Sequence, residues 1–312
     1  MRNLLFAVAL LPSLALSWGG DGHAQIADIA WTKLTPKTQA TIAKILVAGE
    51  PKYRPLGGDV RLAFRDSANF ADYIKGNQNT AFEDIIGVMN ARFMPNITSI
   101  GNEGVRCKTW HYYDIPIRYQ GATPEVQASN ALVALNTAIS ELEKLNKGGL
   151  TDPKMACWWL YWIEHITGDL HQPLHCTSNH EHDPKGDDGG NKFMVKSPEQ
   201  DRDLRLHSMW DGGIGRAIGF EREQGLDPNI EKVTARWSAD PALRPTAAAI
   251  DNLDVMSWIR DGAVMADKIV YGQMRPGEKP NGAYIDSLIT VSKKQAVLAG
   301  ERLAKILNKV LS

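Results

Sequence analysis

A long apolar segment near the middle of the chain leaves few choices of fold. Residues 155–163 read Met-Ala-Cys-Trp-Trp-Leu-Tyr-Trp-Ile, so a helix over residues 153–171 presents apolar side chains on every side. Such a helix belongs in the interior of a protein, because no face of it prefers water. His165 and Asp169 follow in the same segment, and buried charged groups are costly unless they are paired or bind a metal ion. The sequence therefore predicts a central helix that carries polar chemistry near its end.

Helical periodicity also dominates the rest of the chain. Apolar residues recur at helix-like intervals in three further stretches, which are residues 22–48, 124–146 and 285–312. Thr35 and Pro36 divide the first stretch into two helices, because proline is tolerated at a helix start and not in a helix interior. We therefore expect a mainly α protein.

Strand signals are scarce. Residues 193–195 follow two glycines, which predicts at most a short β-hairpin. Residues 177–192 and 272–283 are rich in Gly, Pro and Asp and are expected to be loops. Because no repeat, low-complexity tract or linker divides the chain, residues 18–312 are expected to form a single helical domain.

The first 17 residues have the composition of a secretory signal peptide. Arg2 supplies the positive start, residues 4–16 are apolar, and Ala15 and Ser17 place small residues at the positions that a signal peptidase reads. We expect cleavage after Ser17, which makes Trp18 the first residue of a secreted or periplasmic protein. No later apolar run reaches the roughly 18 residues that a transmembrane helix needs, so no membrane segment is expected.

Charge and cysteine content exclude some classes of protein. The chain has 35 Lys plus Arg against 36 Asp plus Glu, a net charge of −1, so any attraction for phosphate groups must be local. An apolar share of 43% excludes a disordered chain. Three cysteines are too few for a disulfide scaffold, although export permits one disulfide bond in any of three pairings, among Cys107, Cys157 and Cys176.

Histidine carries the chemistry of this sequence. There are eight, at positions 23, 111, 165, 171, 175, 180, 182 and 207. Asp169 follows His165, and Asp211 follows His207, at a spacing of four that places both side chains on one face of a helix. Either pair alone fits a surface ion pair equally well, but the apolar context of His165 favours a metal site. Imidazole and carboxylate ligands without thiolate suit a catalytic zinc ion with an open position.

Five short motifs resemble, in the same order, those of the secreted zinc-dependent single-strand-specific nucleases of the S-one/P-one family. They are WGGDGH at 18–23, WHYYDIP at 110–116, HITGDLHQPLH at 165–175, GDDGGNK at 186–192 and LHSMWD at 206–211. That family is similar in fold to bacterial zinc phospholipase C. With the helical tail, the resemblance covers essentially the whole mature chain. It implies a single helical domain of the zinc phospholipase C and single-strand nuclease type.

The resemblance also implies three zinc ions per chain. The first would be held by Asp72, His111, His165 and Asp169. The second would be held by His175, His207 and Asp211. The third would be held by the free amine and carbonyl of Trp18, by His23 and by a bridging Asp169. Because a terminal amine exists only after the signal peptide is removed, processing would then activate the protein.

Asp72 matches the family pattern less closely than the other ligands. The family usually has Trp-Ala-Asp followed three residues later by Arg, whereas this chain has Phe70-Ala-Asp72 with Lys75. Asp59 and Asp66 are alternatives. Asp72 is preferred because Lys75 then falls where the family places a phosphate-contacting cation, although lysine offers a point charge and not a bidentate fork.

The implied reaction is hydrolysis of phosphodiester bonds by a zinc-bridging hydroxide, which leaves 5′-phosphate ends. Asp72 would orient the hydroxide, and Lys75 would offset charge on the phosphate. The implied substrates are single-stranded DNA and RNA, together with 3′-nucleotides for a 3′-nucleotidase activity. We expect a monomer without a stable protein partner.

The resemblance assigns the base-binding residues as well. Tyr112 matches an aromatic residue that stacks on a base, a contact of about 1–3 kcal/mol that tolerates any sequence. Asp114 matches an acceptor for the base edge, and the loop beside it matches at Gly189, Gly190 and Asn191. Core packing is the alternative role of Tyr112. A duplex hides the base faces, so it is expected to be the poorer substrate.

Two other functions are consistent with parts of this pattern. A zinc-dependent phospholipase C would use much the same ligands, but it tends to have His-xxx-Glu where this chain has His207 and Asp211. A zinc-scavenging protein is suggested by His180 and His182, although the open coordination of the second zinc argues against it. His171 lies off the ligand face and is expected either to support a metal ligand from behind or to be structural.

Overall fold

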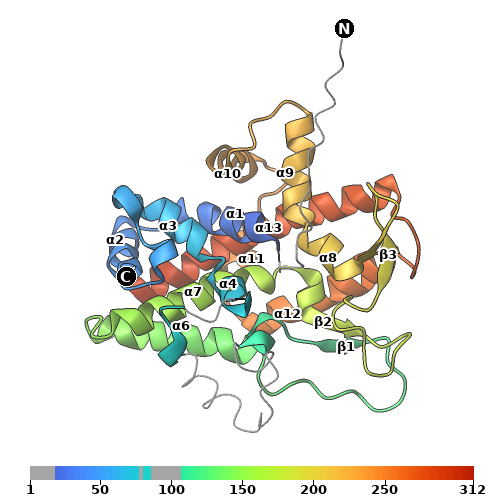
Figure 1. Cartoon of the computed structure of the whole chain (residues 1–312), viewed down its shortest axis with the longest axis horizontal. Coiled ribbons are helices and arrows are strands. Elements are labelled where there is room, and N and C mark those ends of the chain that lie inside the picture. The colour runs from blue at the N-terminus through green and yellow to red at the C-terminus, as the bar shows by residue number, and fades with distance from the viewer. Residues whose placement is uncertain (1–17, 77–79, 86–106) are drawn as a thin grey trace.

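The computed structural model describes residues 18–76, 80–85 and 107–312 (Figure 1). The predicted signal peptide, residues 1–17, lies outside this part of the chain. The helices are α1 (Gly20–Trp31), α2 (Pro36–Leu46), α3 (Val60–Ser67), α4 (Phe70–Gly76), α6 (Ala131–Lys147), α7 (Pro153–Asp169), α8 (Leu206–Asp211), α9 (Gly213–Glu223), α10 (Ile230–Ala239), α11 (Ala247–Asp251), α12 (Val255–Met265) and α13 (Gly282–Leu311). Short 3₁₀ turns are η1 (Pro51–Tyr53), η2 (Leu56–Gly58), η3 (Lys108–His111) and η4 (Pro173–Cys176), and η5 (Ala266–Tyr271) is a π-helix. The mainly α prediction is confirmed.

Helix α7 is the centre of the molecule. The Asp152 side chain accepts a hydrogen bond from the Met155 amide, and Pro153 occupies the first turn, so the helix begins with a good cap. Every residue from Ala156 to Asp169 is buried. Helices α2, α4, α6 and α13 all contact α7 and cover it (Figure 1). The predicted interior position of this helix is confirmed by its three tryptophans, Trp158, Trp159 and Trp162. Each of them is at most 1% exposed.

The other predicted helices form with small changes at their ends. Thr35 accepts a hydrogen bond from the Thr38 amide and starts α2, so the predicted break at Thr35 and Pro36 is confirmed. Helix α6 begins at Ala131 and not at residue 124, because Asn130 caps it by accepting a hydrogen bond from the Val133 amide. No helix among the described residues is long and apolar enough to cross a bilayer.

Helix α13 packs tightly against α1 at Gly300. A Cβ atom added to Gly300 would lie 2.5 Å from Ile29 Cγ2 and 3.1 Å from the Ile26 carbonyl oxygen. A larger side chain would therefore push the two helices apart. Gly219 in α9 offers a matched comparison, because nothing lies within 4 Å of a Cβ added there.

We expect Gly300→Ala to lower the free energy of unfolding by about 1–3 kcal/mol through overpacking. Gly219→Ala should raise it by up to about 1 kcal/mol, because alanine favours a helix over glycine. Urea unfolding of both variants measures the difference. If both substitutions change the free energy of unfolding in the same direction, the close packing of α1 and α13 is contradicted.

Two short sheets contribute strands. The expected hairpin forms between β3 (Met194–Lys196) and β4 (Asp203–Arg205), which pair antiparallel. A second pair, β1 (Ile115–Ile117) and β2 (Thr177–Asn179), is parallel and exceeds the single hairpin expected from sequence. Its strands are short and far apart in the chain, so they leave no local pattern. This pair joins the segment after His111 to the segment after His175.

The cysteines are all free thiols in the structure. Cys107, Cys157 and Cys176 are each buried, and no two of them are joined. The disulfide bond that the sequence permitted is therefore not formed. Burial raises the pKa of all three thiols, which keeps them protonated and unreactive.

Candidate metal centre

The last turn of α7 places two polar side chains in the interior, as the apolar helix predicted. His165 Nε2 lies 3.2 Å from Asp169 Oδ2, and both side chains are fully buried. The spacing of four residues brings them to one face of the helix. Asp169 becomes the centre of the site, because residues from other elements converge on both of its oxygens.

His111 completes a first group with these two residues. Its Nδ1 atom, at the end of η3, lies 3.0 Å from Asp169 Oδ2 and 3.0 Å from His165 Nε2. Ligand atoms about 2.0–2.1 Å from a tetrahedral zinc ion are separated by about 3.3 Å. The three atoms are therefore spaced as ligands of a single ion.

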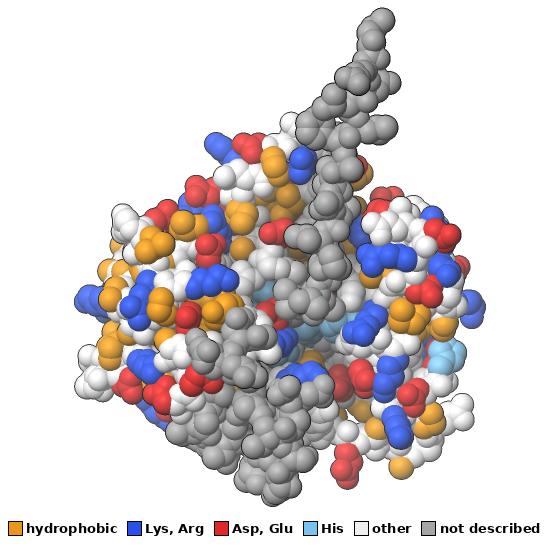
Figure 2. Space-filling view, in the orientation of Figure 1, with side chains coloured by type: hydrophobic (Ala, Val, Ile, Leu, Met, Phe, Trp, Pro, Cys, Tyr) orange, Lys and Arg blue, Asp and Glu red, His pale blue; other side chains and the backbone are white. Residues whose placement is uncertain are grey.

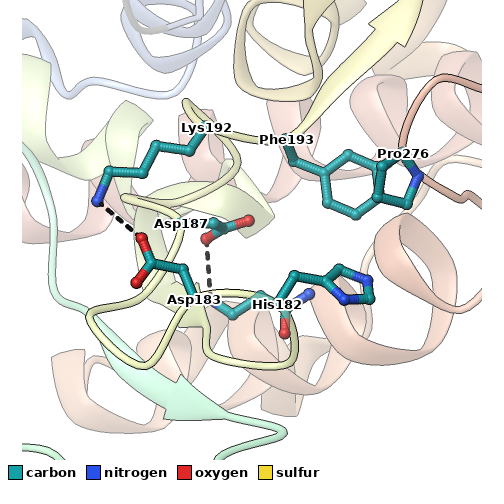
Figure 3. Close-up of a pocket in the computed structure, with 7 residues that line it drawn as sticks. His182, Asp183, Asp187, Lys192, Phe193 and Pro276 are labelled. Atoms are coloured by element: carbon teal, nitrogen blue, oxygen red, sulfur yellow. Dashed lines mark hydrogen bonds and ion pairs between the residues drawn. The ribbon is translucent and has the colours of Figure 1, made fainter.

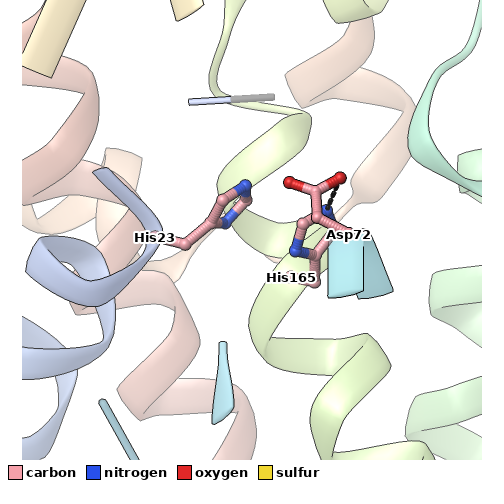
Figure 4. A group of neighbouring side chains, drawn as sticks. All are labelled: His23, Asp72 and His165. Carbon is pink, nitrogen blue, oxygen red and sulfur yellow. Dashed lines mark ion pairs between the residues drawn. The ribbon is translucent and has the colours of Figure 1, made fainter. Parts of the chain in front are cut away.

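Asp72 in α4 approaches the same group (Figure 4). Its Oδ1 atom lies 3.8 Å from His165 Nε2 and 4.0 Å from His111 Nδ1. The alternatives are elsewhere: Asp59 caps α3 through the Leu62 amide, and Asp66 accepts a hydrogen bond from Arg65. The structure therefore brings Asp72, and neither alternative, to the cluster.

Lys75 follows Asp72 by one turn of α4. Its Nζ atom lies 2.7 Å from Asp72 Oδ1, so the lysine and the aspartate form an ion pair. Lys75 also lines the cleft above the cluster. The predicted cation is thus positioned at the mouth of the site.

The start of the predicted mature chain lies at the same place. His23 Nε2 is 3.3 Å from Asp169 Oδ1, and its ring stacks on that of His165 at a centroid distance of 3.9 Å (Figure 4). The Trp18 indole is fully buried and donates a hydrogen bond to the Gly168 carbonyl, beside Asp169. Residue 18 is therefore fixed next to the cluster.

A second group lies beside the first and contains the other predicted ligands. His207 Nε2 lies 3.3 Å from Asp211 Oδ2, and His175 Nε2 lies 3.5 Å from Asp211 Oδ1. His175 Nδ1 lies 3.7 Å from Asp169 Oδ1, which connects the two groups. The three groups of side chains able to hold a metal ion among the described residues contain all the predicted side-chain ligands: His23, Asp72 and His165; His111, His165 and Asp169; and His175, His207 and Asp211.

Backbone carbonyl groups orient three of the histidines. The Nδ1 atoms contact carbonyl oxygens at 2.7–2.8 Å, in the pairs His165 with Ala68, His175 with His111 and His207 with Gly189. A proton on Nδ1 satisfies each contact and leaves the Nε2 lone pair directed toward the carboxylates. This is how proteins orient imidazole ligands toward a metal ion.

Several buried polar atoms in the groups have no hydrogen-bond partner among the described residues. These atoms include Asp169 Oδ1, Asp211 Oδ2 and His175 Nε2. Burial opposes protonation of His175, but the carboxylates of Asp169 and Asp211 raise its pKa to about 9. The protein thus favours positive charge at this point. A bound metal ion supplies that charge, so the residues present fit the predicted metal.

A cleft of about 550 Å³ opens above both groups. Its walls include nearly all of the predicted substrate residues together with three of the ligands, namely Tyr112, Asp114, Gly189, Asn191, His111, His175 and His207. Figure 2 shows histidine side chains at the bottom of a hollow on this face, with lysines and arginines around it. Tyr112 is only partly buried and lines the cleft, so part of its ring is open to a ligand.

Asp114 lines the same cleft and follows the ligand His111 by three residues. Burial, together with the charges of Asp188 and Asp187, raises the pKa of Asp114 to about 7. The carboxyl group is therefore able to change protonation near neutral pH. Gly190 lies behind the wall, where its carbonyl accepts a hydrogen bond from the His207 amide.

The loop with Gly189 is held from behind by residues that sequence reasoning missed. Asp187 accepts hydrogen bonds from the Asn179 amide and from the Tyr271 hydroxyl. A smaller cavity of about 290 Å³ lies on this side of the loop, and Asp187 and Lys192 line it (Figure 3). Tyr271 comes from the π-helix η5, far along the chain, so no local pattern could connect it to the loop.

Gln172 was missed for a different reason. Its Nε2 atom donates to Asp211 Oδ1 at 2.8 Å and fixes the orientation of that carboxylate. It lies within the HITGDLHQPLH motif, but glutamine is not a typical metal ligand, so its residue type does not mark it as part of the site. His171 is structural as expected, with contacts to the Thr167 carbonyl and to Arg302, and burial lowers its pKa to about 3.

Gly189 provides a test of how the loop positions His207. Its φ angle is +62°, and an added Cβ would collide with the Leu174 carbonyl oxygen. We expect Gly189→Ala to displace the carbonyl that holds His207 and to weaken metal binding at the second group by about 10–100-fold. Metal affinity measured by competition with a chelator checks this.

Gly225→Ala is the matched control for backbone strain. Gly225 also has a positive φ, +82°, but nothing lies within 4 Å of an added Cβ. Both variants should lose roughly 1–2 kcal/mol of stability from the left-handed backbone. If Gly225→Ala weakens metal binding as much as Gly189→Ala does, positioning by the loop is refuted.

Several known proteins are similar in sequence to this chain over its whole length. Endonuclease 4 of Arabidopsis thaliana is 24% identical over 322 residues, which cover 100% of this chain and 96% of that protein. Endonuclease 3 of the same plant is 28% identical over 320 residues, with 100% and 96% covered. Endonuclease 5 is 25% identical over 326 residues, with 100% and 97% covered. A sequence profile of the S1/P1 nuclease family matches residues 18–312, and the chain belongs to that family.

Proposed function

We propose that this nuclease is a zinc-dependent endonuclease that cuts single-stranded DNA and RNA to 5′-phosphate products and also acts as a 3′-nucleotidase. The observation that carries the proposal is the position of the His and Asp groups at the base of a cleft whose wall includes Tyr112. Family membership implies a nuclease that uses a metal. The proposed preference for single strands rests on Tyr112, whose ring lines the cleft and could stack on an exposed base.

The proposed ligands are those whose spacing and orientation fit a metal. One zinc ion would be held by Asp72, His111, His165 and Asp169. The second would be held by His175, His207 and Asp211. Trp18 and His23 would hold a third ion with Asp169. Bound zinc ions supply Lewis acidity and lower the pKa of a coordinated water molecule.

The other residues of the cleft bind and orient the substrate. The Asp72 carboxylate would accept a hydrogen bond from the attacking water or hydroxide and direct it toward phosphorus. The Lys75 ammonium group is next to Asp72 and would offset charge on the non-bridging phosphate oxygens. Tyr112 would stack on a base, and Asp114 would accept a hydrogen bond from the base edge.

The N-terminal segment bears on the cellular location of this protein. We propose that residues 1–17 are removed after Ser17 and that the mature protein is secreted or periplasmic. Trp18 is buried beside Gly168, so removal of residues 1–17 would free a terminal amine next to the metal groups. This position supports the proposed cleavage site. A monomer is the proposed state.

The experiment that tests the function compares three substrates. Purified protein should cut denatured DNA, leave 5′-phosphate ends, and cut the same sequence as a duplex much more slowly. Lecithin vesicles should remain intact. Hydrolysis of lecithin without hydrolysis of DNA would replace the proposal with a phospholipase C, and zinc binding without either reaction would leave a zinc-scavenging protein.

A further inference from the structure

We propose that Arg205 forms a phosphate subsite next to the metal centre, which binds a phosphate that flanks the one being cleaved. This inference rests on the proposed function and specifies how the site distinguishes a polynucleotide from a smaller phosphodiester. The ligand is a singly charged backbone phosphate of the same nucleic acid strand.

Arg205 lies at the junction of two elements that fix its position. It is the last residue of β4, pairs with Met194 of β3, and directly precedes α8. The ligand His207 is two residues further on. Arg205 lines the cleft together with His207 and Asn191, so its side chain adjoins the second metal group.

The charge of Arg205 is not neutralised within the described residues. Its side chain is exposed and forms no ion pair or hydrogen bond with them, unlike Lys75, which is paired with Asp72. Two carboxyl groups line the same cleft, those of Asp114 and Asp188; neither forms an ion pair with Arg205, and Lys192 engages Asp188 at 3.1 Å. A guanidinium group is therefore available in the cleft for an anion.

The chemistry of the substrate supplies that anion. A polynucleotide bound with one phosphate at the metal groups carries its next phosphate beyond them along the cleft. Lys75 lies beside the first metal group, and Arg205 lies beside the second. The two cations therefore lie on either side of the metal centre within the cleft. An arginine fork binds phosphate oxygens bidentately, which a lysine cannot do.

A flanking subsite has a clear consequence for selectivity. A dinucleoside monophosphate has a single phosphate, which the metal groups occupy, so Arg205 gains no partner from it. An oligonucleotide offers further phosphates. Arg205 should therefore increase kcat/KM for oligonucleotides and leave that for the dinucleoside nearly unchanged.

The test uses thymidylyl-thymidine and an eight-residue oligothymidylate as substrates for the mature zinc-loaded protein. Arg205→Gln removes the charge, and Arg205→Lys keeps the charge without the fork. Arg202→Gln is the matched control, because Arg202 is exposed in the same hairpin, has no ion pair with a described residue and does not line the cleft. Metal content and melting temperature are measured for each variant.

We expect Arg205→Gln to lower kcat/KM for the oligonucleotide on the order of tenfold and for the dinucleoside less than about twofold. Arg205→Lys should fall between Arg205→Gln and the parent protein. The dependence of log KM on log salt for the oligonucleotide should weaken by about 0.7 in Arg205→Gln, as for one lost phosphate contact on a single strand. Arg202→Gln should match the parent protein on both substrates.

Equal losses on both substrates, or no loss on either, would overturn the subsite. A fall in metal content in Arg205→Gln with equal losses would make the residue structural. If the parent protein cuts neither substrate, the proposed nuclease specificity fails first, and the subsite fails with it. The two failures are therefore distinguishable in one set of measurements.

Discussion

Asp169→Asn is expected to reduce hydrolysis of single-stranded DNA by about 10³-fold or more and to release metal from more than one group. Asp169 contacts His111 and His165 through Oδ2 and contacts His23 and His175 through Oδ1. Metal ions contribute several kcal/mol to transition-state stabilisation, and each 1.36 kcal/mol is a factor of ten in rate. Rates and metal content of the purified variant measure both effects.

Glu164→Gln is the control for this substitution. Glu164 is also a buried carboxyl group of α7, but it accepts a hydrogen bond from Ser67 and belongs to none of the metal groups. Burial raises its pKa well above the usual range, so an amide resembles its protonated form. Glu164→Gln should retain metal and activity. Asp169→Asn with full metal content and activity would refute Asp169 as the shared ligand.

A single extra residue before Trp18 is expected to remove about one zinc ion per chain and to lower activity on the order of 100-fold. The added residue converts the terminal amine into an amide, which is not a metal ligand at neutral pH. Trp18 is held by the Gly168 carbonyl and is fully buried, so the chain has little freedom to offer another amine.

The comparison requires the two forms to differ only at that residue. Protein beginning at Trp18 and protein with one preceding glycine are prepared in the same way, and zinc is counted by mass spectrometry under native conditions. Residue His23 is unchanged in both forms, so its loss cannot explain a difference. Equal zinc content and equal rates would show that the terminal amine has no part in the site.

Much of the fold follows from the sequence, for physical reasons. The residues of α7 are apolar on every side, and the break at Thr35 and Pro36 follows from proline chemistry, so both features were predictable. The parallel pair of β1 and β2 was not, because its strands have three residues each and lie far apart in the chain. The start of α6 was misplaced, because Asn130 sets it through a cap and periodicity does not mark caps.

The candidate site was predictable to a similar degree. The four-residue spacing of His165 and Asp169 required only helix geometry, and the structure confirms their contact. Asp72 could be preferred over Asp59 and Asp66 only through resemblance, since all three lie close together in the sequence. Residues that position the ligands from outside their motifs, such as Tyr271, become visible only when the tertiary structure is known.

We propose that the His and Asp groups form one metal centre that hydrolyses single-stranded nucleic acid. The most direct test titrates zinc into metal-free protein that begins at Trp18, while bound zinc and cleavage of denatured DNA are measured in the same sample. Cleavage activity should appear as zinc binds, saturate near three ions per chain and leave 5′-phosphate ends. Full zinc binding without cleavage of DNA would contradict this proposal.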